Sequence, residues 1–388
     1  MSVATPIPRF RSLDVVKGLA IVLMALDHIR DYWSPNAFSA EDLVYTTPGL
    51  FMTRWITHFC APAFILLAGT SAYLQLAKYG DKSILSRYLL SRGLWLIVLE
   101  VVIVNISWNA GLPVDHLWLQ VIWVIGLSMI ICAGAIWLPD LPLIVLAIGM
   151  IAGHDLLNGV QLAPEWQWLW HILHQQGGFD VFGGQYRIFI AYPLLPWPGV
   201  MLLGYLLGRL FVYAPQHVVY WCTLLGCTAL CTFVLLRVLG SYGDPSSFVA
   251  QPTLVFSLLS FLNVSKYPPS LQFLCVTLGL CFLMLALAQR YKFPGANLLA
   301  TFGKVPLFFY LLHIPFINLS SQIWTFISYG KTVNMLKASP EEWPVGYQPA
   351  LWRVYVVWAV LLIVTYFVCK AYWRFKVARP NQRWLRLI

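Results

Sequence analysis

The chain has 388 residues, of which 60% are hydrophobic and only 10% are charged, whereas a soluble domain usually carries about 25% charged residues. This composition excludes an ordinary soluble globular protein. The formal net charge is +10, but Lys and Arg lie mostly between apolar segments and in the C-terminal tail, which is typical of membrane proteins. We therefore expect the lipid bilayer as a partner and no nucleic acid.

Ten apolar segments follow one another along the chain. Each is expected to be a helix, because a segment in lipid has to satisfy its own backbone hydrogen bonds. The sequence thus predicts an all-α, polytopic transmembrane helix bundle of about ten spans, with residues 1–388 forming a single integral-membrane domain. The predicted spans are 13–33, 47–77, 84–107, 117–138, 141–157, 188–212, 217–239, 269–289, 296–324 and 350–373.

Two sets of connecting segments differ in charge. One set is basic and includes Arg9, Lys78, Arg209 and Arg290, together with the C-terminal tail. The other set is longer and less basic, and an excess of Lys and Arg marks the cytoplasmic side. We therefore predict that both termini are cytoplasmic and that the first helix is not cleaved. The loops predicted on the outer side are 34–46, 109–116, 158–187, 240–267 and 325–349.

The first span, DVVKGLAIVLMALDHIRDYW (14–33), ends in four ionisable residues: Asp27, His28, Arg30 and Asp31. Arg30 and Asp31 are explained most simply by a helix that has reached the lipid headgroups. Asp27 and His28 are not, because ionisable groups inside the membrane are costly and usually mark a functional site. Helical spacing would let Asp27 pair with Arg30 or Asp31, and His28 with Asp31. Histidine is also suited to proton transfer near neutral pH.

Two other spans carry ionisable side chains in a similar way. In the second span, Arg54 and His58 are four residues apart and share a face. A hairpin of the first two spans would bring them beside the polar end of the first. In the late segment TFGKVPLFFYLLHIPF (301–316), Tyr310 and His313 also share a face. These residues are therefore secondary candidates for the same site.

No metal site is expected. His171 and His174 are three residues apart in the Trp- and Gly-rich loop 165–187, but two ligands without a third nearby are a weak basis for metal binding. The eight Cys lie almost wholly in apolar runs without a C-x-x-C pair, which favours free thiols that pack as small hydrophobic side chains.

Three stretches resemble a known family. RSLDVVKGLAIVLMALDHIRDYW (11–33) resembles the first helix of bacterial membrane proteins related to heparan-alpha-glucosaminide N-acetyltransferase, and TTPGLFMTRWITHFCAPAFILLAGTSAYL (46–74) is similar to their second conserved block. GKVPLFFYLLHIPF (303–316) resembles the ending of the wider transmembrane acyltransferase superfamily, which includes the acyltransferase 3 enzymes. Its first helix has a basic residue and Gly with a His ten residues further on, as do Lys17, Gly18 and His28.

The resemblance implies a membrane acyltransferase of a bacterial inner membrane, which moves an acyl group, commonly acetyl from acetyl-CoA, to a hydroxyl or amine of a sugar or glycan. It makes His28 the leading catalytic candidate. Lys17 departs from the pattern, because the superfamily most often has Arg there and Lys cannot form a planar bidentate clamp. The lysosomal enzyme also has a proposed catalytic His in its first luminal loop, where this chain has Thr46 and Thr47. That role is therefore not carried over.

The mechanism that we expect uses His28 as a general base, which removes a proton from the acceptor as it attacks the thioester. Asp27 or Asp31 would orient the histidine, and helical spacing favours Asp31. Arg54 or His58 would stabilise the developing oxyanion. Direct transfer and a covalent acyl-histidine intermediate both remain open.

Acetyl-CoA, or another acyl-CoA, is a polyanion that would arrive from the cytosol. The candidates for holding its phosphates are Lys17, Lys82, Arg87 and Arg92, with the thioester arm reaching up between the helices. A simpler explanation of Lys82, Arg87 and Arg92 is that they mark the cytoplasmic side.

Two other functions are compatible with the residues. In a proton-coupled transporter, Asp27, His28, Arg54 and His58 would form a proton relay or substrate site. The third alternative is a non-enzymatic membrane partner or assembly factor. The resemblance favours the enzyme over both alternatives, whereas composition alone would not. An oligomer is compatible with the sequence.

Overall fold

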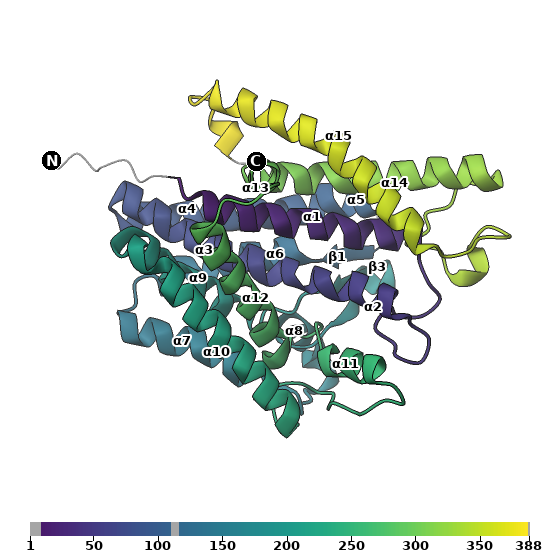
Figure 1. The fold of residues 1–388 in the computed structure, drawn as a ribbon, viewed down its shortest axis with the longest axis horizontal. Coiled ribbons are helices and arrows are strands. Elements are labelled where there is room, and N and C mark those ends of the chain that lie inside the picture. The colour runs from purple at the N-terminus through teal and green to yellow at the C-terminus, as the bar shows by residue number, and fades with distance from the viewer. Residues whose placement is uncertain (1–8, 110–115, 387–388) are drawn as a thin grey trace.

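The computed structural model describes residues 9–109 and 116–386, and helices dominate both segments (Figure 1). Three short strands accompany them. The helices are α1 (Arg11–Trp33), α2 (Pro48–Trp55), α3 (Cys60–Tyr79), α4 (Lys82–Leu99), α5 (Asn105–Asn109), α6 (Val121–Ala135), α7 (Asp140–Gly153), α8 (Gln167–Leu173), α9 (Trp197–Tyr213), α10 (Val218–Leu239), α11 (Leu254–Leu262), α12 (Leu271–Arg290), α13 (Ala296–Gly303), α14 (Pro306–Tyr329) and α15 (Leu351–Val377); the strands are β1 (His116–Leu119), β2 (Gly177–Val181) and β3 (Tyr186–Ile190).

The helical bundle that the sequence predicts is confirmed, and each of the ten predicted spans overlaps at least one helix. The number ten stays a prediction. Among the described residues, six helical segments are long and apolar enough to cross a membrane, and the bent pair of α13 and α14 would make a seventh. Of the other three, α1 carries several charges, whereas α6 and α9 are apolar but only 15 and 17 residues long. The chain is an integral membrane protein.

Helix α1 packs against α3, α12, α13, α14 and α15, and most of its side chains are buried. Its closest neighbour is α13, because both helices have glycine where they cross. A Cβ atom on Gly18 would lie 1.8 Å from the carbonyl oxygen of Leu299, and one on Gly303 would lie 1.8 Å from that of Asp14. The two backbones therefore touch, which fixes α1 in the bundle.

The axis of α14 is bent by 89° from that of α13 across a short break. Pro306 begins α14, at a position where a helix tolerates proline because its missing N–H would have no partner there. The bend sends α14 back along α1 and α15, which it contacts. Tyr310 and His313 lie in the early turns of α14, and their side chains are buried.

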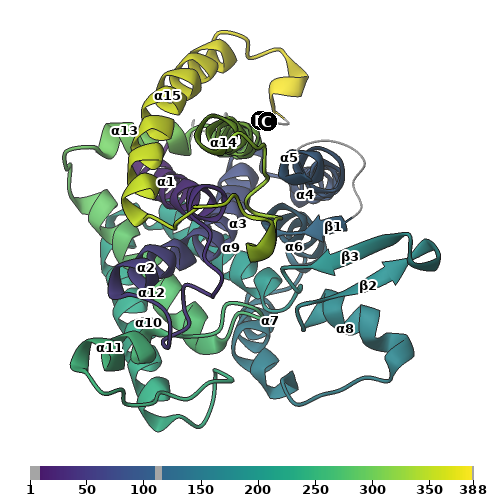
Figure 2. The same cartoon turned by 90° about the vertical axis from the view of Figure 1, so that its right-hand side faces the viewer.

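The three strands form a small sheet in the order β1-β3-β2, in which β1 and β3 are parallel and β2 and β3 antiparallel. Figure 2 shows this sheet beside α6 with α8 on its outer side. The prediction of all-α structure is wrong at these positions. The predicted spans 117–138 and 188–212 begin as strands before α6 and α9, because short apolar runs such as HLWL and YRIFI fit either structure until their tertiary partners are known.

The loops predicted on the outer side contain more structure than the sequence indicated. Loop 158–187 folds into α8, β2 and the start of β3, and loop 240–267 contains α11. Figure 1 shows α2, α11, β1 and β3 towards one end of the bundle. Loop segments distant in sequence therefore gather at one end, where they enclose the cavity described next.

Candidate active site

The end of α1 and the start of α14 bring two histidines together. His28 Nδ1 lies 2.7 Å from His313 Nε2, and the two rings are stacked with their centroids 5.0 Å apart. His313 is completely buried, whereas His28 is half-buried and lines a cavity. The expectation that Asp31 orients His28 is wrong for this geometry, because Asp31 instead accepts a hydrogen bond from Arg30 at 2.7 Å.

A hydrogen bond to a backbone carbonyl indicates which nitrogen of each histidine carries a proton. His313 Nδ1 lies 2.8 Å from the carbonyl oxygen of Tyr310, and since a carbonyl can only accept, His313 Nδ1 donates. The other nitrogen of a neutral imidazole is an acceptor, so His313 Nε2 accepts the proton that His28 Nδ1 donates. This assignment, made from the hydrogen-bond network, leaves an unprotonated Nε2 on His28.

Trp108, at the end of α5, holds the other face of His28. Its ring packs edge-on against His28, with centroids 5.0 Å apart and planes at 78°. The carbonyl oxygen of Trp108 accepts a hydrogen bond from the Tyr32 hydroxyl at 3.2 Å, and Asn318 of α14 donates to the carbonyl oxygen of Ser107 at 3.0 Å. The orientation of His28 is thus fixed from two sides.

A network of ion pairs surrounds Asp27. Arg54 of α2 lies 2.5 Å from one carboxylate oxygen of Asp27, and Arg30 lies 3.0 Å from the other. The prediction that the second span brings Arg54 beside the polar end of the first is confirmed. Since Asp27 accepts from two guanidinium groups, both of its oxygens are occupied by cations rather than by a histidine.

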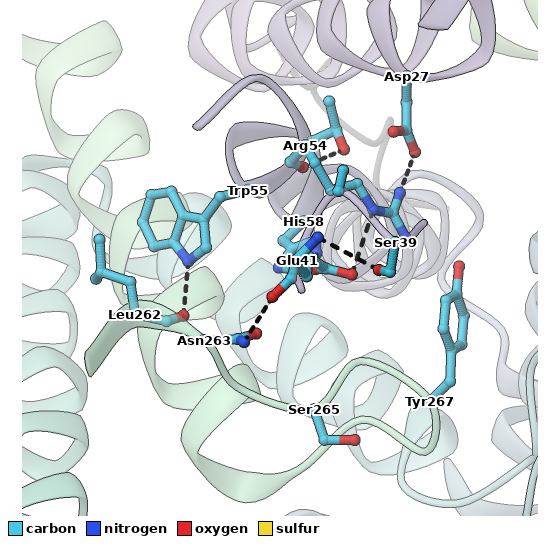
Figure 3. Close-up of polar contacts among 12 residues, drawn as sticks. Asp27, Ser39, Glu41, Arg54, Trp55, His58, Leu262, Asn263, Ser265 and Tyr267 are labelled. Atoms are coloured by element: carbon cyan, nitrogen blue, oxygen red, sulfur yellow. Dashed lines mark hydrogen bonds and ion pairs between the residues drawn. The ribbon is translucent and has the colours of Figure 1, made fainter. Parts of the chain in front are cut away.

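His58 faces a different carboxylate. Its Nε2 lies 2.6 Å from Glu41, a residue of the loop between α1 and α2, and Arg54 lies 3.7 Å from the same carboxylate. Figure 3 shows Arg54 with Asp27 on one side and Glu41 and His58 on the other. Burial would raise the pKa of Glu41, but the interaction with His58 and the charge of Arg54 lower it to about 2. Glu41 is therefore an anion at neutral pH.

These groups border a cavity of about 1020 Å³, at the upper end of the range for small-molecule sites. Each loop predicted on the outer side contributes to it. His58 is not among its lining residues, so Glu41 stands between His58 and the cavity. Its polar and aromatic lining includes Asp27, His28, Arg30, Asp31, Glu41, Arg54, Trp108, Asn109, His116, Trp118, Gln120, Gln176, Tyr192, Lys266, Tyr267, Tyr310, Lys337 and Glu342.

A second cavity of about 220 Å³ lies deeper along α1. Lys17 lines it and donates a hydrogen bond to the Ser71 hydroxyl at 2.8 Å, and Arg92 of α4 also lines it. The two cavities have four wall residues in common: Met24, Phe64, Val121 and Tyr310. They therefore meet close to the histidine pair.

The remaining predicted site residues lie apart. Lys82 is half-buried and Arg87 is exposed, and neither lines the second cavity, whose basic residues are Lys17 and Arg92. Of the histidines considered for a metal, His171 contacts the carbonyl oxygen of Gln175 and His174 contacts Asn158. The described part of the chain contains no group of three or more His, Cys, Asp or Glu side chains arranged to hold a metal ion.

Sequence reasoning missed three ionisable side chains, of which Lys266 and Glu100 are buried and Glu41 is half-buried. Glu41 and Lys266 sit in loops, where a charge carries no signal by itself. Glu100, in contrast, interrupts the apolar run LWLIVLEVVIV and could have been noticed. It is completely buried in a π-helical turn at Glu100–Val104, and accepts a hydrogen bond from the backbone N–H of Gln120 at 3.2 Å.

Thr46 and Thr47 lie where the resemblance would place a loop histidine, and both have structural roles here. The side chain of Thr47 caps α2 by accepting a hydrogen bond from the backbone N–H of Leu50. The Thr46 hydroxyl donates to the carbonyl oxygen of Ala40 at 2.7 Å.

Fold and site together define an integral membrane protein with a histidine pair close to the place where two cavities meet. Residues 9–239 match the model of a family described as heparan-alpha-glucosaminide N-acetyltransferase, catalytic. The match covers more than half of the chain, which therefore belongs to this family, and membership implies a membrane acetyltransferase. No curated protein matches the chain significantly. The match spans α1 to α10 and ends before Lys266, Tyr310 and His313.

Proposed function

We propose that the protein transfers an acetyl group from acetyl-CoA to a hydroxyl or amine of a sugar or glycan, with His28 as the general base. The observation that carries this proposal is the contact between His28 Nδ1 and His313 Nε2, because the tautomers inferred from it leave Nε2 of His28 unprotonated on a side chain that lines the large cavity. General-base catalysis of this kind contributes roughly 10²–10⁴ in rate.

The reaction proceeds as an acyl transfer. His28 Nε2 takes the proton of the acceptor hydroxyl or amine as its oxygen or nitrogen attacks the thioester carbonyl. The new C–O or C–N bond forms, the C–S bond breaks, and the thiolate of CoA leaves with its electron pair. His313 stays neutral and positions His28 throughout. A covalent acyl-histidine on His28 Nε2 would satisfy the same geometry in two steps.

Tyr310 is well placed to stabilise the oxyanion of the tetrahedral intermediate, because its side chain lines both cavities and a phenol can donate a hydrogen bond. Sequence analysis gave Arg54 or His58 for this role, but Arg54 already contacts both Asp27 and Glu41, and His58 contacts Glu41. We therefore assign Arg54, with Asp27, mainly to holding α1 and α2 together at the site.

The second cavity provides the route for the donor. Lys17 and Arg92 line it and would attract the phosphates of CoA at the predicted cytoplasmic side, while the thioester arm would extend past Met24 and Phe64 to His28. Donor and acceptor would then approach His28 from opposite sides. The proposal assumes the predicted topology, with cytoplasmic termini in a bacterial inner membrane.

The test uses membranes that contain the full chain, incubated with radiolabelled acetyl-CoA and a panel of amino sugars and glycans. We expect label transfer by the wild type and a loss of at least about 100-fold in His28→Ala. His217→Ala is the matched control, since His217 lies in the connection between α9 and α10 and lines neither cavity. Equal transfer by wild type and His28→Ala would refute the catalytic assignment. The alternative of a proton-coupled transporter gains no support from the family, and it predicts solute uptake into proteoliposomes without CoA.

A further inference from the structure

An apolar stretch lies in the connection between α10 and α12, which sequence analysis treated as a loop on the outer side. No charged residue occurs in 245–265, and the stretch contains helix α11. Leu254, Val255 and Leu258 lie on one face of α11, and each is more than half exposed. An exposed, uncharged apolar face of this kind marks a surface that binds either protein or membrane.

The C-terminal end of α11 is satisfied by protein side chains. The last carbonyl oxygens of a helix have no partner within it, and at an aqueous surface water usually satisfies them. Here the carbonyl oxygens of residues 260–263 all accept from side chains: Arg237 of α10 donates to three of them at 2.7–3.0 Å, and Trp55 of α2 donates to that of Leu262 at 2.9 Å. Arg237 is itself only 2% exposed. Such internal pairing is what a backbone needs where it borders lipid.

The hydroxyl groups of α11 and of its N-cap are also bonded within the segment. Thr253 accepts from the backbone N–H of Phe256 at 3.3 Å. The Ser257 hydroxyl accepts from the backbone N–H of Gln251 at 2.8 Å and donates to the carbonyl oxygen of the same residue at 3.1 Å. Ser260 accepts from a backbone N–H of the preceding loop. The polar groups therefore face inward, and the apolar side chains are left outside.

Helix α11 packs against the end of a helix that faces lipid. The ring of Phe261 lies 5.4 Å from that of Phe233 in α10, and α10 belongs to a segment long and apolar enough to cross a membrane. Leu235 and Val238, in the last turns of α10, are exposed. Figure 2 shows α11 at the periphery of the bundle beside α10, on the side away from the β sheet. The lipid that covers α10 is therefore adjacent to α11.

We propose that α11 is an interfacial helix whose partner is the lipid bilayer. Leu254, Val255 and Leu258 insert into the leaflet at the end of the bundle that holds α2, to a depth of about 5–10 Å at the boundary of headgroups and acyl chains. At nine residues, α11 is too short to cross the bilayer, so it lies at one surface. The inference does not depend on the proposed acetyl transfer, and it adds a lipid-binding segment where the sequence predicted only a loop.

This lipid-binding segment is attached to the wall of the large cavity. Asn263, which follows α11, donates to the carbonyl oxygen of Glu41 at 3.0 Å, and Glu41 lines the cavity. Figure 3 shows this contact beside the bond from Trp55 to Leu262. Through these two bonds, the depth of α11 in the bilayer fixes how one edge of the cavity lies relative to the membrane surface.

The test measures the environment of α11 in the full chain in lipid nanodiscs. A spin label is attached to Leu258→Cys in a background with Cys227→Ser and Cys231→Ser, which removes the two exposed thiols. Leu235→Cys in α10 is the control for lipid. Val345→Cys is the control for water, because Val345 is 99% exposed in the loop before α15. We expect the labels at 258 and 235 to collide more with oxygen than with a water-soluble nickel chelate, and the label at 345 to show the reverse.

A second measurement needs no substitution. The wild-type chain is irradiated in nanodiscs that contain a phospholipid with a photoactivatable diazirine in its acyl chain, and the adducts are located by mass spectrometry. We expect adducts in 248–258 and none in 340–349. Access of the nickel chelate to position 258 equal to that at 345 would overturn the proposal. So would a label at 258 shielded from both reagents, which would indicate cover by protein such as a second copy of the chain, or a wild type without adducts in 248–258.

Discussion

His28 Nδ1 and His313 Nε2 are 2.7 Å apart although 285 positions separate them in the chain. The pair gives each histidine a different task. His313 is buried and fixed by the Tyr310 carbonyl, whereas His28 reaches the cavity with one nitrogen unprotonated. In the proposed mechanism, this hydrogen bond determines which nitrogen of His28 acts as the base.

The first prediction follows from this bond. His313→Leu removes the acceptor of His28 Nδ1, so His28 can adopt the wrong tautomer or turn away, and kcat should fall about 10–100-fold, as is typical when a group that orients a functional histidine is lost. KM for acetyl-CoA should stay within a factor of about two.

His313→Gln provides the matched control, because its amide oxygen can accept the same hydrogen bond. We expect it to retain more activity than His313→Leu, and the pH profile of kcat/KM to shift more in the leucine variant. A leucine variant with wild-type kcat, or one changed only in KM, would contradict a positioning role.

The second prediction concerns stability. Asp27→Asn leaves Arg30 and Arg54 without their common anion, and breaking a buried ion pair on one side typically costs about 3–5 kcal/mol. Asp31→Asn should cost about 1 kcal/mol or less, because Asp31 is more exposed and pairs with Arg30 alone. Thermal unfolding of the detergent-purified variants measures both. Similar melting temperatures for the two variants would show that Asp27 does not organise the network.

The third prediction is a pH dependence that originates in Glu41. The folded protein lowers the pKa of Glu41 from 4.5 to about 2, so ionised Glu41 stabilises the fold above pH 4.5, and this contribution is lost as the pH falls towards 2. Glu41→Gln should therefore lower the free energy of unfolding by about 2–3 kcal/mol at pH 7.

The measurement compares melting temperatures of wild type and Glu41→Gln between pH 7 and pH 3. Their difference should be constant down to about pH 5 and shrink below it. Glu342→Gln, which affects a carboxylate that caps a short turn near the surface, serves as the control. A difference that stays constant to pH 3, or one that grows on acidification, would be incompatible with the lowered pKa.

The fourth prediction separates the basic residues assigned to the donor. Arg92→Gln should raise KM for acetyl-CoA by about tenfold, since a lost interaction with a charged group costs about 1.5–3 kcal/mol. Arg87→Gln, one helical turn and a half away on the exposed side of α4, should leave it unchanged. Initial rates at varied acetyl-CoA concentrations measure KM for each variant. Equal changes in KM for Arg92→Gln and Arg87→Gln would show that acetyl-CoA does not bind in the second cavity.

Much of the bundle could be predicted from sequence, because the length and hydropathy of an apolar segment indicate a membrane helix. The polar ends of α1 and α14 could be predicted for a related reason, since Asp27, His28 and His313 interrupt apolar segments. Helical spacing could not identify their partners. Helical spacing suggested Asp31, on the same helix, as the partner of His28. The partner in the structure is His313 of α14, and local periodicity cannot predict a contact between helices that are distant in sequence.

The buried and half-buried loop residues could not be predicted from sequence, for a different reason. Glu41 and Lys266 look like ordinary loop charges in the sequence, and only the structure shows that Glu41 is half-buried and Lys266 buried. That burial depends on tertiary contacts, such as those of Glu41 with Arg54 and His58, which the apolar pattern does not indicate. The strands β1 and β3 were missed because short apolar runs fit both helix and strand.

The bond between His28 and His313 also imposes an order of events on biosynthesis. α1 enters the membrane first, and the ribosome must add most of the remaining chain before α14 can supply the second ring. Throughout that interval the nascent protein holds an unsatisfied histidine at the end of its first span. If this pair is catalytic as proposed, the site is completed late in translation, when α14 inserts, and a chain that stops at residue 239 would contain the region that matches the family and lack His313.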